Sequence, residues 1–396
     1  MTKKVSTPAL RFKGFTYTWK QRKLSDQFSD FIVPMRDKPK KFGGNIPWTR
    51  IEDIEGKYLN GSLSGQFVSK DTIKQMNLKI IPKDSLIVSS SATFGVVAII
   101  TQDLITNQTF IGLVPNDKET LDFWYTFFHS NEARNYMRLQ SAGSTIFYIA
   151  REHFEKMPII IPFKDEMITI GKYFSNLDRL ITLHQRKYDK LTNMKKSMLE
   201  KMFPKNGANV PEIRFKGFTD AWEQRKLGDI VQITMGQSPD GSTYSDVPSD
   251  YILVQGNADL QNGWVCPKVW TSQMTKKADA GDLIMSVRAP AGTMGKTTYN
   301  VVIGRGVAAI KGNDFIYQLL VKMDIDGFWK ALSCGSTFES LNTGNIKNAE
   351  VLIPDIDEQE KIGQYFTNLD HLITLHQREL EKLKNLKKAC LEKMFV

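Results

Sequence analysis

Ile170 to Phe203 reads IGKYFSNLDRLITLHQRKYDKLTNMKKSMLEKMF, and Ile362 to Phe395 reads IGQYFTNLDHLITLHQRELEKLKNLKKACLEKMF. At a fixed offset of 192 residues, 24 of the 34 aligned positions are identical. Bulky or apolar residues recur at alternating spacings of three and four, which is typical of a coiled-coil seam. The seam residues are Phe174, Leu177, Ile181, His184, Tyr188, Leu191, Lys195, Met198 and Met202, repeated as Phe366, Leu369, Ile373, His376, Leu380, Leu383, Lys387, Cys390 and Met394.

Neither stretch contains Gly or Pro after its second residue, so the pattern predicts two uninterrupted helices. Each seam spans about 43 Å at 1.5 Å per residue. A helix of that length with one apolar stripe needs a partner, and its own copy is the nearest one. If the two helices pair antiparallel, the domains they carry sit at opposite ends, and the helix span is comparable to the roughly 34–36 Å between DNA half-sites one turn apart.

A second, shorter repeat precedes each long helix. PALRFKGFTYTWKQRKLSD at residues 8–26 returns as PEIRFKGFTDAWEQRKLGD at residues 211–229, with 13 of 19 positions identical at an offset of 203. The chain is therefore a tandem duplication in which a short repeat, a variable insert and a long helix occur twice.

The two inserts, roughly 27–162 and 230–354, share a layout but little sequence. Short apolar runs bounded by turn residues predict strands, and Leu121–Arg138 and Phe315–Leu332 each predict a helix. Both inserts end on the same phrase, Gly143-Ser144-Thr145 and Gly335-Ser336-Thr337, before a strand closed by Pro. Two domains that recognise different targets would share a scaffold and differ in the sequence of their inserts, as these do. Neutral drift after duplication is the alternative.

Composition narrows the class of protein. The chain has 396 residues and a net charge of +10, which favours a polyanionic partner such as nucleic acid. The sequence contains no apolar run long enough for a membrane span, and MTKKVSTPAL lacks the apolar core of a secretory signal. Cys266, Cys334 and Cys390 form neither a disulfide framework nor a metal motif, so we expect a reducing cytoplasm.

No catalytic constellation emerges from the sequence. GTMGKTT at residues 292–298 approaches a phosphate-binding loop, but position 290 is Pro where the motif needs Gly, so a connecting loop with an exposed Lys296 is favoured. Asp355 and Glu358 near Lys361 fit a helix start better than a nuclease cluster. His184 and His376 occupy equivalent seam positions, where a hydrogen-bonded pair or a pH-sensitive pair is possible. No metal site or cofactor site is predicted.

With these motifs in view, the sequence resembles the specificity subunit of type I restriction–modification enzymes. The resemblance covers essentially the whole chain and rests on RFKGFT–W–QRKL twice, LDxLITLHQR with a LEKMF ending twice, and IP closing each insert. It implies a non-catalytic reader of a bipartite, asymmetric double-stranded DNA sequence. It also implies two partner modification subunits that methylate adenine and restriction subunits that cleave.

The resemblance and the repeats together predict an α+β fold. We expect two similar α+β target-recognition domains separated by two long helices that form an antiparallel coiled coil with pseudo-twofold symmetry. The predicted boundaries are 1–162 for the first domain, 163–203 for the first helix, 204–354 for the second domain and 355–396 for the second helix.

Candidate DNA-reading residues are polar or basic loop residues at corresponding places in the two inserts. Arg suits guanine, Asn and Gln suit adenine, and Lys mostly contacts phosphate, although loop solvation is the plainer alternative for each. The first set is Arg36, Lys38, Lys40, Lys41, Ser89, Ser90, Ser91, Thr93, Asn107 and Gln108. The second set is Gln237, Ser238, Gln255, Asn257, Arg288, Thr293, Lys296 and Arg305.

The repeated aromatics Phe12, Trp19, Phe215 and Trp222 are candidates for binding the modification subunits, and core packing against the helix ends is their alternative. Two other functions stay open at this point. One is an enzyme that acts alone, and the other is a coiled-coil protein-binding adaptor without DNA specificity. Salt-dependent binding to duplex DNA would exclude the adaptor.

Overall fold

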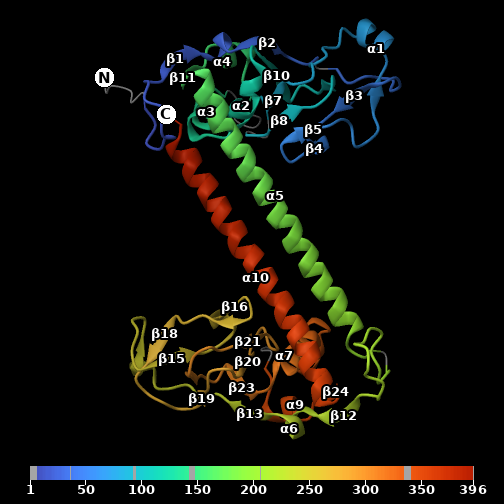
Figure 1. Cartoon of the computed structure of the whole chain (residues 1–396), viewed down its shortest axis with the longest axis vertical. Coiled ribbons are helices and arrows are strands. Elements are labelled where there is room, and N and C mark those ends of the chain that lie inside the picture. Colours follow the sequence, from blue (N-terminus) through green and yellow to red (C-terminus); the bar gives the residue numbers. More distant parts are fainter. Residues whose placement is uncertain are drawn as a thin grey trace. The chain divides into compact units, whose positions relative to one another are not determined.

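A computed structural model describes residues 7–35, 37–91, 95–141, 148–205, 207–333 and 340–395. The chain divides into two compact units, the first formed by Met1–Leu183 with Glu379–Val396 and the second by His184–Arg378. The long helices α5 (Lys164–Lys201) and α10 (Ile356–Lys393) each contribute one part to each unit (Figure 1).

The first unit consists of a six-stranded sheet in the order β2-β10-β7-β8-β5-β4, a three-stranded sheet β6-β3-β9 and the pair β1-β11. Its elements are β1 (Lys20–Lys23), η1 (Leu24–Asp26), β2 (Phe28–Ile32), β3 (Ile46–Thr49), η2 (Ile51–Asp53), β4 (Ile54–Glu55), β5 (Tyr58–Leu59), β6 (Phe67–Val68), α1 (Lys70–Gln75), β7 (Leu86–Ser89), β8 (Val97–Ile100), β9 (Ile105–Thr106), β10 (Phe110–Pro115), η3 (Lys118–Thr120), α2 (Leu121–Phe127), α3 (Asn131–Gln140), α4 (Arg151–Glu155) and β11 (Pro158–Ile161).

The second unit has a six-stranded sheet in the order β13-β23-β20-β21-β17-β16, a five-stranded sheet β14-β18-β15-β22-β19 and the pair β12-β24. Its elements are β12 (Glu223–Lys226), α6 (Leu227–Ile230), β13 (Gln232–Met235), η4 (Gly241–Thr243), β14 (Tyr244–Ser245), β15 (Tyr251–Val254), η5 (Asn257–Asp259), β16 (Leu260–Gln261), β17 (Trp264–Val265), β18 (Val269–Thr271), β19 (Lys277–Ala278), β20 (Leu283–Ser286), β21 (Met294–Lys296), β22 (Val301–Ile303), β23 (Val307–Lys311), α7 (Asp314–Ile325), α8 (Phe328–Leu332), α9 (Thr343–Lys347) and β24 (Glu350–Ile353).

The two six-stranded sheets have the same topology. In both, four of the five neighbouring strand pairs are antiparallel and one is parallel, β5 with β8 in the first sheet and β17 with β21 in the second. The register also matches, because Phe110 pairs with Ser89 where Val307 pairs with Ser286. The divergent inserts therefore share one sheet frame, and positions in one unit can be assigned to positions in the other.

The long helices pack antiparallel within each unit, as the seam pattern predicted. In the first unit, Lys387 Nζ lies 2.5 Å from Asp178 Oδ1, and Tyr173 contacts Cys390. In the second unit, the repeat equivalents Lys195 and Asp370 form the corresponding ion pair at 2.6 Å. The same two residue types thus fasten the helix pair once in each unit.

Each short repeat binds the end of a long helix. The Leu10 N–H donates to Lys393 O and the Ile213 N–H donates to Lys201 O, both at 2.9 Å, so each repeat docks on the helix that ends in its own unit. Its arginine then reaches the start of the other helix. Arg214 donates through Nε and Nη2 to the carboxylate of Glu358, at 2.7 and 2.8 Å. Arg11 does the same to Glu166.

The expectation of one helix over 121–138 and one over 315–332 is wrong, because each stretch forms two helices. Ser130 has extended backbone angles, and its hydroxyl accepts from the Ala133 N–H, so it caps α3 and separates it from α2. Gly327 adopts φ +77° between α7 and α8. In the first unit, a serine N-cap starts the second helix, and in the second unit, a glycine with left-handed backbone angles separates the two helices.

Candidate nucleic-acid interface

A polar cleft of about 490 Å³ opens in the second unit where β13 and β20 end and β23 begins. Four of the predicted DNA-reading residues line it: Ser238, Gln255, Arg288 and Arg305. Ser238 follows β13, Gln255 follows β15, Arg288 follows β20, and Arg305 lies before β23. The cleft thus collects side chains from four separate segments of the insert.

Backbone contacts hold these segments close together. The Val287 N–H donates to Gly306 O at 2.9 Å, and the Arg305 N–H donates to Ser238 Oγ at 3.2 Å. A Cβ added at Gly306 would lie 2.0 Å from Gln255 O, so only glycine permits this approach. Arg288 and Arg305 are exposed, and none of the described residues that line the cleft is a carboxylate, so both guanidinium groups can bind an anionic or guanine-like ligand.

An equivalent cleft of about 510 Å³ lies in the first unit. It is lined by Val33, Pro34, Ser90, Ser91, Gln108, Ile111, Tyr148, Ile149 and Arg151. The Ser90 N–H donates to Thr109 O and the Ile149 N–H donates to Ser90 O, both at 2.8 Å, so Ser90 joins three of the four segments that line this cleft.

Matching contacts align the two clefts position by position. Ser89 Oγ donates to Ser91 O at 2.9 Å, and Ser286 Oγ donates to Arg288 O at 3.0 Å. Ser91 forms a β-bridge with Tyr148 where Arg288 forms one with Ser340. Ser91 therefore corresponds to Arg288, and the strand register makes Gln108 correspond to Arg305. Equivalent positions carry unlike side chains, with two guanidinium groups in one cleft and a hydroxyl and an amide in the other.

The remaining predicted residues lie elsewhere. Ser89 is buried, and its hydroxyl donates to Ser91 O rather than facing solvent. Lys38, Lys40 and Lys41 are exposed before β3, Gln237 is exposed after β13, and Thr293 is half-buried next to β21. Asn107 Oδ1 accepts from Thr109 Oγ1, and Asn257 begins η5. Arg36 and Thr93 lie outside the described residues, as do Gly143-Ser144-Thr145 and Gly335-Ser336-Thr337.

The expectation of an exposed Lys296 in a connecting loop is wrong. Lys296 is the last residue of β21, its side chain is 14% exposed, and its ammonium lies 2.5 Å from Asp314 Oδ1. The sequence around Lys296 was interpreted as a loop because it contains glycine, and because the strand Met294-Gly295-Lys296 has no β-branched residue to indicate a strand. A lysine held in this way is poorly placed to contact a phosphate.

The clefts also contain residues that the sequence did not single out. Tyr244 lines the second cleft, and Tyr148 and Arg151 line the first. Tyr148 is 48% exposed, and Arg151 Nε donates to Glu155 Oε1 at 2.6 Å. The shared Gly-Ser-Thr phrase was the available signal for Tyr148, because that residue lies three positions after the phrase ends at Thr145.

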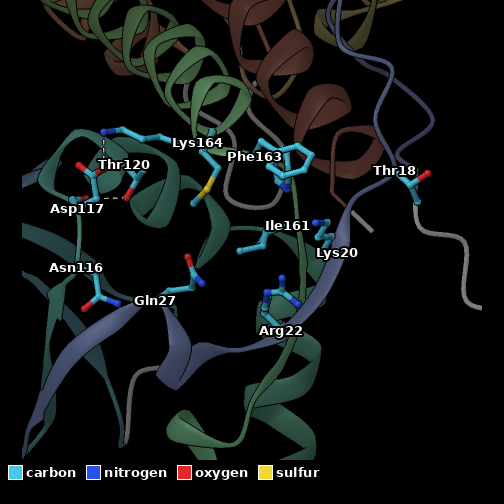
Figure 2. A pocket seen from close by; sticks show the side chains of 12 residues that line it. Thr18, Lys20, Arg22, Gln27, Asn116, Asp117, Thr120, Ile161, Phe163 and Lys164 are labelled. Atoms are coloured by element: carbon cyan, nitrogen blue, oxygen red, sulfur yellow. Dashed lines mark hydrogen bonds and ion pairs between the residues drawn. The ribbon is translucent and has the colours of Figure 1, made fainter.

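A smaller hollow of about 270 Å³ lies at the start of α5, where Lys20, Arg22 and Lys164 meet Asn116 and Asp117 (Figure 2). Lys164 Nζ lies 2.5 Å from Asp117 Oδ2, and this pairing holds the pKa of Asp117 below its usual value. The second insert passes directly from Lys311 through Gly312 to Asn313 and lacks an η3 turn. The described residues between β23 and α7 therefore contain no counterpart of the turn that borders this hollow.

The repeated aromatics divide into two kinds. Trp19 and Trp222 are each 3% exposed, which favours the core-packing alternative for both. Phe12 and Phe215 are partly buried and lie edge-on to Tyr173 and Tyr365. Their role in binding modification subunits stays a prediction.

The acidic residues at the second helix start have structural roles. Asp355 Oδ1 accepts from the Glu358 N–H at 2.9 Å, which confirms the capping interpretation. Glu358 is fully buried against Arg214. Within the described residues, no group of three or more His, Cys, Asp or Glu side chains could hold a metal ion.

The histidine pair is confirmed in the second unit, where His184 Nδ1 and His376 Nδ1 lie 3.1 Å apart. Desolvation lowers the pKa of His376, and the neighbouring His184 and Lys187 lower it further. Because this pKa lies below its unfolded value of about 6.5, the unfolded chain binds more protons as the pH falls through that range. Stability that is present above about pH 6.5 is lost below it.

We therefore expect the urea midpoint of the wild-type chain to fall between about pH 7.5 and pH 5.5, and to fall less for His376→Asn. His153→Asn is the matched control, because His153 is exposed in α4. Equal pH sensitivity in His376→Asn and the wild-type chain would contradict this assignment.

The comparisons with known proteins agree with this architecture. The sequence model for "Type I restriction modification DNA specificity domain" matches residues 18–193 and 219–385. The putative type I restriction enzyme MjaX specificity subunit of Methanocaldococcus jannaschii is 25% identical, over 93% of this chain and 91% of that protein. The EcoprrI specificity subunit of Escherichia coli is 23% identical, over 88% and 84%.

A solved structure supports the fold. The crystal structure of a type I restriction–modification S subunit from M. genitalium matches with a TM-score of 0.67 at 15% identity, covering 98% of this chain and 99% of that one. No described helix is both long enough and apolar enough to cross a membrane. With the family model matching both repeats, the chain belongs to the type I restriction–modification DNA specificity family.

Proposed function

We propose that each cleft reads one part of a bipartite, asymmetric DNA target through the major groove. The observation that supports this most directly is the pair of topologically equivalent clefts whose corresponding positions, Ser91 with Arg288 and Gln108 with Arg305, carry unlike polar groups. A common frame gives both clefts the same access to a base edge, and the unlike side chains give them different preferences.

The proposal extends to the partners. Relatives named as type I restriction enzyme specificity subunits suggest that this chain assembles with two methyltransferase subunits and with restriction subunits, and that it supplies target choice but no chemistry. The duplicated frame supports two copies of one partner, because each copy could dock on an equivalent surface. We place the complex in the cytoplasm, where Cys266 and Cys390 stay free thiols.

The test uses the full chain, tagged and purified from its host with the subunits that accompany it, and a pool of randomised DNA duplexes. Sequencing the bound duplexes should give two conserved blocks separated by unconserved positions. A single block, or no block, would overturn the proposal.

Arg288→Ala gives the sharper result. We expect the guanine preference at one position of one block to weaken by about 1–3 kcal/mol, while the other block is unchanged. Arg225→Ala is the matched control, because Arg225 is also exposed but is paired with Glu223 in β12, away from the cleft. Weakening of both blocks together in Arg288→Ala would contradict modular reading.

A further inference from the structure

Each unit encloses a lysine ammonium group in a nearly identical cage. In the first unit, Lys57 Nζ lies 2.6 Å from Asp122 Oδ1, 3.1 Å from Ser175 Oγ and 4.9 Å from the ring centre of Tyr125. The Lys57 side chain is only 9% exposed. The cage therefore joins the turn between β4 and β5 to α2 and to the long helix α5.

In the second unit, Lys296 Nζ lies 2.5 Å from Asp314 Oδ1 and 4.5 Å from the ring centre of Tyr317. Thr367 Oγ1, on the long helix α10, donates to Asp314 Oδ2 at 2.9 Å. The carboxylate, the tyrosine and the helix hydroxyl are repeat equivalents of those in the first cage, each at the 192-residue offset. Even the fourth wall matches, with Tyr58 and Trp264 each 6.0 Å from the ammonium.

The two lysines, however, do not occupy equivalent positions. The Ile99 N–H donates to Lys57 O and the Lys296 N–H donates to Gly263 O, both at 2.9 Å. This contact aligns Lys57 with Gly263 and Ile99 with Lys296. One unit thus supplies its cation from the hairpin turn and the other from the adjacent strand. The residues that surround the ammonium group are equivalent in the two units, but the lysine that carries it comes from a different position in each.

Ion-pair strength does not explain this arrangement. The side chains of Asp122 and Asp314 are 35% and 46% exposed, so water screens part of each interaction. The cage instead fixes the position of the sheet relative to the two helices. The lysine backbone is hydrogen-bonded to the sheet, while its ammonium group contacts the helix that covers the sheet and lies beside the long helix. Burial raises the pKa of Tyr125 and Tyr317, so both rings present a neutral π-face to the cation.

The cage also lies along the same strands as the reading cleft. In β20, Leu283 pairs with Lys296 at one end, and Ser286 leads to Arg288 in the cleft at the other end. We infer that Lys57 and Lys296 are positioning residues that hold each reading sheet at a fixed angle on its long helix, and so set the angle at which its cleft meets the DNA. This inference rests on the proposed reading function.

The natural difference between the units provides the experiment. Lys57→Gly removes the first cation, and Lys57→Gly with Ile99→Lys rebuilds it in the way the second unit does. Each variant is purified as the tagged full chain with its accompanying subunits and tested on the randomised duplex pool. Lys83→Gly is the control for charge, because Lys83 is exposed in a loop of the same unit.

We expect Lys57→Gly to reduce base discrimination in one block of the target about tenfold, the scale of one mismatched base pair. The other block should not change. The double variant should recover discrimination to within about twofold of wild type, which is small beside that mismatch scale. Hydrogen exchange in β7 and β10 should match wild type in both variants, because a positioning role leaves the sheet folded.

Different failures have different meanings. If the wild-type assembly selects no bipartite target, the proposed function falls and takes this inference with it. If the wild-type target is bipartite and Lys57→Gly leaves it unchanged, only the inference is overturned. Loss of one block without recovery in the double variant, or faster exchange throughout β7 and β10, would also overturn it, because the lysine would then be a plain stability residue.

Discussion

Glu358→Ala is expected to destabilise the second unit by about 3–5 kcal/mol, the cost of leaving a buried charge without its partner. Glu358 is fully buried, and its carboxylate accepts from Arg214 Nε, Arg214 Nη2 and Trp222 Nε1. Removing it leaves the Arg214 guanidinium without its carboxylate, with Nη2 still donating to Asp220 O, and leaves the Trp222 indole N–H without its acceptor. The carboxylate also joins the short repeat to the start of α10, so the loss reaches both elements.

Hydrogen exchange of peptides from β12 and β24 under increasing urea measures this loss locally. That choice matters because a chain of two units need not unfold in one step. Glu223→Ala is the matched control, because Glu223 lies in β12 itself and its pair with Arg225 is an exposed contact worth only about 0–1 kcal/mol. Similar losses of local stability in the two variants would show that water solvates the Arg214 guanidinium once its carboxylate is gone.

The first unit offers a graded comparison. Glu166 forms the same bidentate contact with Arg11, but Trp19 Nε1 has no hydrogen-bond partner among the described residues, whereas Trp222 Nε1 donates to Glu358. Glu166→Ala therefore strands one polar group fewer. We expect its cost to be smaller than that of Glu358→Ala by roughly one hydrogen bond, about 1 kcal/mol.

The regular parts of the fold were predictable because their signals repeat. The three-four spacing between Phe174 and Met202 predicted a helix pair, and the pairs Asp178–Lys387 and Lys195–Asp370 confirm it within each unit. The spacing of the two DNA parts by the length of these helices stays a prediction. Capping by Asp355 followed from an acidic residue placed before a helical pattern.

The site was only partly predictable, because polar loop residues carry no periodic signal. Arg288 and Arg305 are 17 residues apart in the sequence, and the pairing of β20 with β23 brings them to one cleft. Lys296 was misplaced for the same reason. Its partner Asp314 lies on another element, and nothing in the local sequence shows that a lysine will point inward. Only the comparison of one unit with the other revealed the cage.

Gly171→Leu is expected to cost about 3 kcal/mol, the upper part of the range for overpacking a core. In an exposed helix the same change would be favourable by nearly 1 kcal/mol, because glycine is a poor helix former. The sign reverses here because a Cβ at position 171 would lie 2.6 Å from the backbone N of Phe123 and 2.9 Å from Asp122 Cβ. Backbone cannot move aside as a flexible side chain can, so α2 must separate from α5.

That separation would also disturb the Lys57 cage, because Asp122 belongs to it. Gly171→Leu should therefore lower both the urea stability of the first unit and discrimination in one block of the DNA target, while Lys172→Leu, at the exposed neighbouring position, changes neither. Gly363→Leu should have the same effect on the other block, because a Cβ at position 363 would lie 2.8 Å from the Phe315 N. A stable Gly171→Leu variant with an unchanged target would mean that the angle between α2 and α5 does not govern reading, and the positioning role of the cage would lose its structural basis.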